Sequence, residues 1–393
     1  MWDADSSPHR TDIALVGGGA MGLATAYFLK SLSPSLAVTV IEVDCRYEFC
    51  STLRASGGVR CLFSCPENIE MSLFSRDFIG RFPECMALPD RAAPIDWVAG
   101  GYLSIVPPAG VAVLARNFET QRAHGCDVQW LTPAELKARY PSMHVDDLAA
   151  GVLSPRDGWC DPHGLLHGFR RQVLAQGARI VEGRVVGFEH GRTALRAARL
   201  ESGGHIEAKA FVNAAGAWAG EVGAMAGVYL PIAPMRRFEH YFTCGVPMEH
   251  LPYVKEPSRL AFRSEGAGFS GGLVDGDEPR GFHFEVDHGY FERVVWPAAA
   301  HRFPPLESAK CHRTWAGLYE QCELDGNPII GATSVGNFYV NAGYSGHGMM
   351  HAPASGRALA ELILYGEYRS IDLTRLGYVR VAQGEPYREA GIL

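Results

Sequence analysis

Closely spaced glycines near the start of the chain could bind a phosphate. The run Gly17-Gly18-Gly19-Ala20-Met21-Gly22 fits the GxGxxG pattern. In that pattern the first glycine permits a tight turn after a strand, the second lets the backbone approach a pyrophosphate, and the third lets a helix pack close to the sheet. The helix N-terminus behind the turn stabilises negative charge. The run therefore predicts a dinucleotide site, and a glycine-rich turn without a ligand is the alternative.

An acidic residue, Glu42, closes the next predicted strand. A carboxylate at that place can accept hydrogen bonds from a ribose. It fits FAD or NAD and disfavours NADP, because a 2′-phosphate would be repelled. The glycine run and Glu42 together make the dinucleotide prediction more specific than the glycines alone.

A second stretch, residues 51–60, supplies hydroxyls, glycines and two cations soon after that strand. Such a loop can run along a pyrophosphate towards an isoalloxazine ring, and a plain solvated loop is the alternative. The candidate cofactor contacts in it are Ser51, Thr52, Arg54, Ser56 and Gly57.

Two further segments of small residues, 212–219 and 343–350, follow predicted strands. The first lets the backbone approach a flat ligand, or alternatively a packed helix. The second offers glycine N–H groups and a helix N-terminus that can stabilise the negative charge of a reduced flavin, with a flexible surface loop as the alternative. The candidate contacts are Gly216, Gly343, Gly346, His347, Gly348 and Met349.

Metal binding is disfavoured at the two places where ligand residues are close in sequence. Cys61 and Cys65 form a CxxxC, but no further ligands follow at zinc-like spacing. His347 and His351 are four residues apart, yet the glutamate of an HExxH motif is missing. The flavin loop is the better interpretation of this histidine pair.

The elements that must position these residues begin with a strand–helix–strand unit. Residues 12–17 form an apolar run that ends at glycines, which predicts a buried strand. Residues 20–32 have helical spacing, and Pro34 ends the helix. Residues 38–42 are β-branched and predict a second strand, which completes a nucleotide-binding βαβ unit.

Later segments predict further elements. Asp161 is an expected N-cap, and Thr132 with Glu135 forms an expected capping box. Helices are predicted at 133–139, 162–176 and 352–366, strands at 178–189 and 206–213, and an antiparallel sheet over the turn-rich segment 230–313.

We therefore expect an α/β fold with an α+β second domain. A Rossmann-like FAD-binding domain would be discontinuous, and the inserted segments would build a substrate domain with a large antiparallel or mixed sheet. The expected FAD-binding domain comprises 1–85, 150–225 and 325–393, and the substrate-binding domain comprises 86–149 and 226–324.

Bulk properties narrow the class of partner. The chain has 393 residues and a formal net charge of −7, and it contains no dense block of Lys and Arg. Because phosphate binding needs clustered cations, no nucleic-acid partner is expected. No apolar run reaches the roughly 18 residues of a transmembrane segment. The polar N-terminus and ten scattered cysteines favour a cytoplasmic protein with reduced thiols.

At these glycine and loop segments the chain resembles the D-amino-acid-oxidase-like superfamily of FAD oxidoreductases, which includes sarcosine oxidases, glycine oxidases and dimethylglycine dehydrogenases. The resemblance covers nearly the whole chain. A closer likeness, carried by segments 64–69, 157–162, 284–288 and 314–317, is to FAD-dependent oxidoreductase domain proteins implicated in respiratory complex I assembly.

The resemblance implies a function and a substrate pocket. It implies oxidation of the C–N bond of an amino acid or N-alkyl amine by hydride transfer to FAD, giving an imine that hydrolyses, with O2 or a redox carrier as acceptor. A substrate carboxylate needs a cation, and Arg237 is the best candidate. The adjacent Arg236 is the alternative, because neighbours on a strand face opposite ways.

Other residues receive roles through the resemblance. Val185 matches the strand that contacts adenine, and Arg60 matches an arginine beside the flavin ring. The expected pocket-lining residues also include Tyr319, His347 and Tyr241, which shares a strand face with Arg237. Each could instead be a packing residue.

Three departures from sarcosine oxidases limit the analogy. Gly317 stands where those enzymes carry the flavin-linked cysteine, so the FAD is expected to be non-covalent. Ser270 is near the place of an oxygen-activating lysine, and Met350 replaces a lysine that binds the carboxylate. The alternatives in function are a flavin-binding assembly or scaffold factor, and a 2-hydroxy-acid dehydrogenase with His347 as its base.

Overall fold

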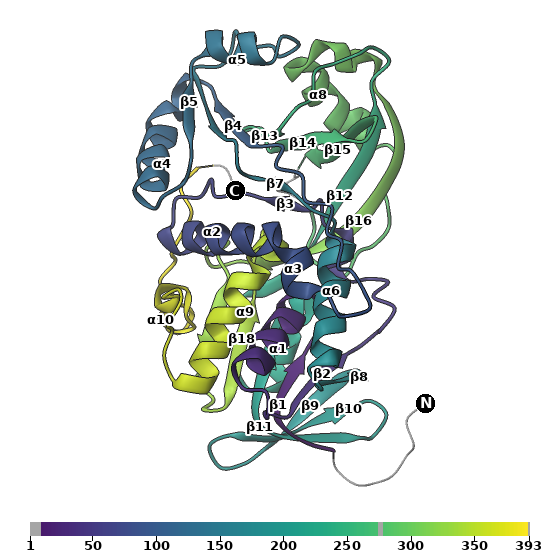
Figure 1. Cartoon of the computed structure of the whole chain (residues 1–393), viewed down its shortest axis with the longest axis vertical. Helices are drawn as coiled ribbons and strands as arrows, with labels where there is room; N and C mark the ends of the chain where they lie inside the picture. Colours follow the sequence, from purple (N-terminus) through teal and green to yellow (C-terminus); the bar gives the residue numbers. More distant parts are fainter. Residues whose placement is uncertain (1–8, 274–277, 392–393) are drawn as a thin grey trace.

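The structure is a computed structural model that describes residues 9–273 and 278–391. It is built on two 8-stranded sheets and a 2-stranded sheet of β3 (Gly58–Val59) and β7 (Gly158–Trp159). In Figure 1 the first large sheet lies in the lower half of the molecule and the second in the upper half.

The first sheet has a parallel centre. Strands β11, β1, β2 and β8 pair in parallel, and β18 joins β11 in parallel. Its strands are β17 (Ile329–Ala332), β18 (Phe338–Ala342), β11 (His205–Asn213), β1 (His9–Val16), β2 (Val38–Glu42) and β8 (Arg179–Glu182). In addition, β10 (Leu195–Leu200) pairs with β11, and β9 (Val185–His190) pairs with β10.

The parallel pairing explains where the predicted segments meet. All five residues of β2 are buried, as expected for a strand covered on both faces. Parallel strands end at the same edge of a sheet, and ligands of such folds bind at that edge. Gly17, Glu42, Gly183, Ala214 and Gly343 follow or close these strands, so they gather there.

The second sheet is mixed, because β13 pairs in parallel with β4 whereas the other pairs are antiparallel. Its strands in order are β16 (Lys310–Cys322), β12 (Ile232–Thr243), β15 (Gly268–Leu273), β14 (Leu260–Glu265), β13 (Tyr253–Lys255), β4 (Tyr102–Val106), β6 (Ala150–Ser154) and β5 (Gln129–Leu131).

Alternation along these strands separates a core face from a cavity face. On β12, Phe238 and Phe242 pack into the core of this half of the molecule. Arg237 and Glu239 alternate with them and line a cavity, which Phe238 also touches. The same alternation places Val254 of β13 in the core and its two neighbours on the cavity side.

Helices cover the sheets. The first sheet packs against α1, α6 and α9 through one apolar core. The helices are α1 (Ala20–Leu32), α2 (Pro66–Gly80), α3 (Phe82–Met86), α4 (Val111–Ala123), α5 (Pro133–Arg139), α6 (Pro162–Ala175), α7 (Ala219–Met225), α8 (Trp296–Arg302), α9 (Gly348–Tyr365) and α10 (Val379–Gln383).

Most of the predicted elements are confirmed. The βαβ unit is present as β1, α1 and β2. Thr132 and Glu135 form the predicted capping box of α5, and Asp161 caps α6 by accepting from His163 N at 3.0 Å and Gly164 N at 2.8 Å. The predicted α/β class with a second mixed sheet is therefore correct.

Three predicted elements differ from the structure. The strand predicted at 178–189 is two strands, β8 and β9, because the chain leaves β2 at Gly183 and turns to pair with β10. The segment 230–313 includes the helix α8, which was not predicted because the aromatic-rich pattern of the segment indicated strands. Helix α9 begins at Gly348, before the predicted start at 352.

The predicted domain boundaries differ from the sheets by one strand, since β6 (Ala150–Ser154) pairs in the second sheet. The division into two domains otherwise stays a prediction. In the described residues, no helix has the length and apolar character needed to span a membrane.

Candidate active site

The glycine turn after β1 packs closely against the backbone at Ala214 and against the start of α1. Gly17 has a φ of +105°, and a Cβ there would lie 2.3 Å from the carbonyl oxygen of Ala214. A Cβ on Gly22 would lie 1.9 Å from the Gly17 carbonyl oxygen. The pattern thus requires glycine at both positions, one for the turn and one for packing α1 against it.

Glu42 closes β2 beside this turn. Its Oε2 accepts from Gly18 N at 2.6 Å, and its Oε1 accepts from Asp44 N at 3.0 Å. Burial raises the pKa of this carboxyl. Each carboxylate oxygen has more than one acceptor position, so the group can also receive a hydroxyl.

The loop after β2 connects the two halves of the molecule. Thr52 Oγ1 accepts from Ala20 N at 3.2 Å, at the start of α1. Ser51 Oγ donates to Leu318 O at 2.7 Å, and Arg54 Nη1 donates to Ala316 O at 2.5 Å, both on β16. The hydroxyls and the cation in this stretch therefore tie the glycine turn to the second sheet.

A long cavity of about 760 Å³ joins the predicted cofactor segments. Residues far apart in the sequence line it together. The predicted contacts that line it are Gly17, Gly19, Ala20, Met21, Glu42, Ser51, Thr52, Arg54, Ser56, Val185, Gly216, Gly346, Gly348 and Met349.

Four predicted contacts do not line this cavity. Gly22 packs beneath the turn, and Gly343 N donates to Glu320 Oε2 at 3.0 Å. Gly57 and His347 line a neighbouring cavity of about 700 Å³ instead. Gly22 and Gly343 thus shape the loops without facing either cavity.

The two cavities meet at a shared wall. Residues of both halves form it, and each lines both cavities: Ser56, Arg237, Tyr253, Tyr319, Gly346 and Met349. A Cβ on Gly346, whose φ is +103°, would lie 2.3 Å from the Tyr319 ring. The glycine loop before α9 therefore packs directly on β16.

Arg237 and Arg236 point to different surroundings. The Arg237 guanidinium lies over the Tyr319 ring, with 5.0 Å between its Cζ and the ring centroid. Arg236 instead pairs with Glu278 at 2.5 Å and lines neither cavity. The geometry agrees with the choice of Arg237 over its neighbour.

Tyr241 does not reach the site. It shares a strand face with Arg237, as expected, but lines neither cavity, and its ring lies 6.1 Å from that of His312. Four residues of strand displace it by about 13 Å. The structure therefore corrects the expectation that Tyr241 lines the pocket.

Arg60 and His347 line the second cavity side by side with Phe63. The Arg60 Cζ lies 4.3 Å from the Phe63 ring centroid, and the His347 ring lies 5.3 Å from it. Burial first, and the charge of Arg60 second, lower the pKa of His347 to about 3. His347 is therefore neutral, with Nδ1 3.2 Å from His351 Nδ1 and a buried Nε2 that has no partner in the described residues.

Sequence reasoning missed several cavity residues on the second sheet. Glu239 lies two residues beyond Arg237 on the same face, and Ser270 Oγ donates to it at 2.8 Å. Burial raises the pKa of Glu239 to about 7. Lys255 of β13 lines the second cavity, near the stacked rings of Tyr102 and Tyr253. The period-2 alternation of the strand would have indicated Glu239. Lys255 could be placed in the cavity only once the order of the strands in the sheet was known.

Glu320 is a further missed acid. It follows Tyr319 on β16 and lines the first cavity. Burial raises its pKa to about 7, and the backbone N–H groups of Gly343 and Tyr344 oppose that rise. The carboxyl thus anchors the glycine loop from within the cavity wall.

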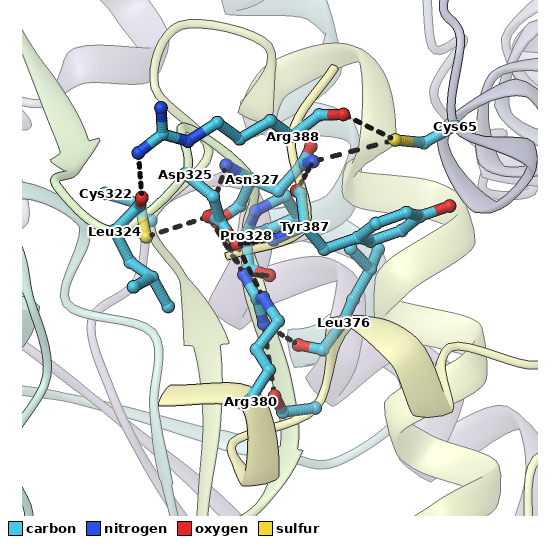
Figure 2. A network of polar contacts seen from close by, with 12 residues as sticks. Cys65, Cys322, Leu324, Asp325, Asn327, Pro328, Leu376, Arg380, Tyr387 and Arg388 are labelled. Carbon is cyan, nitrogen blue, oxygen red and sulfur yellow. Dashed lines mark hydrogen bonds and ion pairs between the residues drawn. The ribbon is translucent and has the colours of Figure 1, made fainter. Parts of the chain in front are cut away.

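The end of the described chain closes the second cavity. Figure 2 shows the network that holds it, in which Arg380 pairs with Asp325 at 2.8 Å. Asp325 also accepts from Tyr387 N at 3.0 Å. Glu389 follows and lines the cavity together with Ala390. The segment 389–391 is therefore part of the pocket wall.

Comparisons with known proteins agree with this architecture. A family model described as FAD dependent oxidoreductase matches residues 12–362. The chain is 34% identical to the Bos taurus FAD-dependent oxidoreductase domain-containing protein 1, covering 98% of this chain and 88% of that protein. It is 28% identical to Mus musculus mitochondrial sarcosine dehydrogenase, over 91% of this chain and 40% of that protein.

The solved structure of L-proline dehydrogenase from P. horikoshii is also similar. Its TM-score is 0.85 at 28% identity, and the match covers 97% of this chain and all of that chain (100%).

Proposed function

The chain belongs to the family of FAD-dependent oxidoreductases, and from this premise we propose that it oxidises the C–N bond of an amine that carries a carboxylate. The observation that carries the proposal is the junction of the two cavities, where Arg237 and Tyr319 line both. An amino acid or an N-alkyl amino acid is the proposed substrate class.

The residues of the first cavity fit FAD. Backbone atoms leave no room for a side chain at Gly17 or Gly22, Gly19 lines the cavity, and α1 begins directly behind this turn, where its N-terminus can bind a pyrophosphate. Glu42 is proposed to bind a ribose, and Val185 and Gly216 to flank the adenine end. His347 lines the second cavity, and we propose that the flavin ring lies at the junction of the two cavities.

We propose that the FAD is bound non-covalently. Gly317 offers no thiol, and a Cβ there would lie 3.1 Å from the Cβ of Arg54. Ser51, Thr52, Arg54, Ser56 and the loop at 346–349 are the proposed contacts along the cofactor. When bound, FAD accepts a hydride from the carbon that bears nitrogen.

The protein side chains orient the substrate. Arg237 is proposed to bind its carboxylate, since a guanidinium forms charge-assisted hydrogen bonds to carboxylates. Tyr319 fixes the plane of that guanidinium by stacking. The proposed role of Arg60 is to place positive charge beside the flavin site, where negative charge grows on reduction.

His347 is proposed as a neutral hydrogen-bonding partner. Because burial lowers its pKa to about 3, it holds a proton poorly and would be a weak general base near neutral pH. This argues against the alternative of a 2-hydroxy-acid dehydrogenase that depends on His347 as its base.

The test is anaerobic mixing of the FAD-loaded protein with N-methyl and D- or L-amino acids, read at the long-wavelength flavin band. The proposal expects bleaching by at least one carboxylate amine and none by the same amine without its carboxylate. A protein that binds FAD but is bleached by no amine would instead support the scaffold alternative. Mixing the bleached protein with O2 or with a redox carrier then identifies the electron acceptor as the compound that reoxidises the flavin.

A further inference from the structure

The second cavity carries an excess of positive charge. The cations that line it are Arg60, Arg237, Lys255, Arg259 and Arg280. Among the described residues, Glu389 is the one carboxylate in its wall. Such an imbalance attracts anions, because a cleft concentrates the field of its charges.

Within the described residues, Glu389 forms no ion pair with any of these cations. Its carboxylate accepts from Ser64 N at 2.5 Å, from Cys65 N at 3.1 Å and from Asn68 Nδ2 at 2.6 Å, at the start of α2. Of the cations, Arg280 pairs with Glu323 at 3.1 Å, and Arg259 is exposed. The charge deeper in the cavity therefore belongs to Arg237, Arg60 and Lys255.

Arg60 and Lys255 form a cationic pair without a protein counter-ion. Neither has an ion pair within the described ranges, 9–273 and 278–391. Arg60 is only 6% exposed, and its Nε is buried without a hydrogen-bond partner. Burial first, and the charge of Arg60 second, lower the pKa of Lys255 well below its ordinary value. A bound anion would relieve both costs.

Lys255 and Arg237 enter the cavity from separate strands. The sheet order is β12, β15, β14, β13, so their backbones are separated by three strand spacings, about 14 Å. Both side chains are long and line the same cavity. Tyr319 lines this cavity together with Arg237 and Arg60; burial raises the pKa of its hydroxyl, and the charges of both arginines oppose that rise.

We propose that Arg60 and Lys255 form a second anion subsite, so that the preferred substrate is an amine with two carboxylates, such as a dicarboxylic amino acid or its N-alkyl derivative. The proposal rests on the proposed function, in which Arg237 binds the first carboxylate. A cavity of about 700 Å³ accommodates a molecule of that size.

The test uses glutarate and valerate as probes, since valerate replaces one carboxylate of the diacid with a methyl group. Each is titrated into the FAD-loaded, oxidised protein, and binding is read from the perturbed flavin spectrum. We expect glutarate to bind about 10- to 100-fold more tightly, the worth of one charge-assisted hydrogen-bonded contact.

Variants locate the second subsite. Lys255→Met should remove most of the preference for glutarate and leave valerate binding unchanged, whereas Lys255→Arg should retain the preference. The matched control is Lys310→Met, which removes an exposed lysine that lines neither cavity. FAD content, read from the same spectra, verifies that each variant is folded.

The outcomes separate the two proposals. Equal binding of both probes to the unmodified protein, or a glutarate preference that survives in Lys255→Met, overturns the second subsite and leaves the role of Arg237 intact. If neither probe perturbs the flavin of a protein that holds FAD, carboxylate binding itself fails, and the proposed function fails with it.

Discussion

The Arg237 guanidinium carbon lies 5.0 Å from the centroid of the Tyr319 ring, on neighbouring strands of the second sheet. Both residues line the cavity proposed for FAD and the cavity proposed for substrate. A guanidinium stacked on a ring is oriented without losing its charge. We therefore propose that an anionic substrate meets the flavin at this pair.

Replacing Arg237 with Met should weaken reduction of the flavin by a carboxylate amine. The loss of a charge-assisted contact predicts a fall of about 10- to 100-fold in the apparent second-order rate constant. Stopped-flow reduction at several substrate concentrations measures it. Arg236→Met, whose side chain pairs with Glu278 outside both cavities, is the control and should leave the rate unchanged. Equal effects of the two variants would remove Arg237 from the site.

Replacing Gly17 with Ala should abolish FAD binding. The added Cβ would lie 2.3 Å from the Ala214 carbonyl oxygen, at a φ of +105° that side chains rarely adopt. Fluorescence titration with FAD measures the affinity. Gly177→Ala is a matched control, because Gly177 also has a left-handed φ, +79°, but an added Cβ meets nothing within 4 Å. Tight FAD binding by Gly17→Ala would contradict the proposed pyrophosphate site.

Glu320→Gln should stabilise the FAD-free protein in a pH-dependent way. Burial raises the pKa of Glu320 to about 7 from an ordinary 4.5, so between these values the folded state binds more protons than the unfolded state. The stability of the natural protein must then fall as pH rises through this window, and glutamine does not titrate. The gain in melting temperature should therefore grow from pH 4.5 to 7 and stay constant above it. A gain independent of pH would show that Glu320 titrates normally.

Arg380→Met should destabilise the protein and loosen the wall of the second cavity. The side chains of Arg380 and Asp325 are 7% and 0% exposed, so the variant leaves a buried carboxylate without its partner. Breaking such a pair costs about 3–5 kcal/mol. Urea unfolding measures the loss, and limited proteolysis reports release of residues 387–391. The control is the exposed pair of Arg369 and Glu367, whose loss we expect to cost at most about 1 kcal/mol. An equally small cost for Arg380→Met would contradict a stabilising role for the buried pair in Figure 2.

Local patterns identified several residues that line the first cavity. The turn at Gly17 and the acid at Glu42 belong to one βαβ unit, so a short stretch of sequence is enough to predict a dinucleotide site. Thr52, Val185 and Gly346 come from distant segments, and the resemblance to a family was needed to connect them. Their common cavity follows from the parallel strands, whose ends meet at one edge.

The substrate half could be predicted only in part. Period-2 alternation identified the face of Arg237, but it could not limit how far along β12 the cavity extends, so Tyr241 was included wrongly. Lys255 lies on a three-residue strand, β13, which pairs on one side with β4, a strand about 150 residues earlier in the chain. No local pattern reports such pairing, because register is set by the packing of the whole sheet.

The most direct test of the account is anaerobic reduction of the bound FAD by a carboxylate amine that carries deuterium on the carbon next to nitrogen, compared with the undeuterated amine. The account predicts that both compounds bleach the flavin and that deuterium slows the reaction, because the hydride leaves from that carbon. A flavin that stays oxidised with every carboxylate amine, in a protein shown to hold FAD, would contradict it.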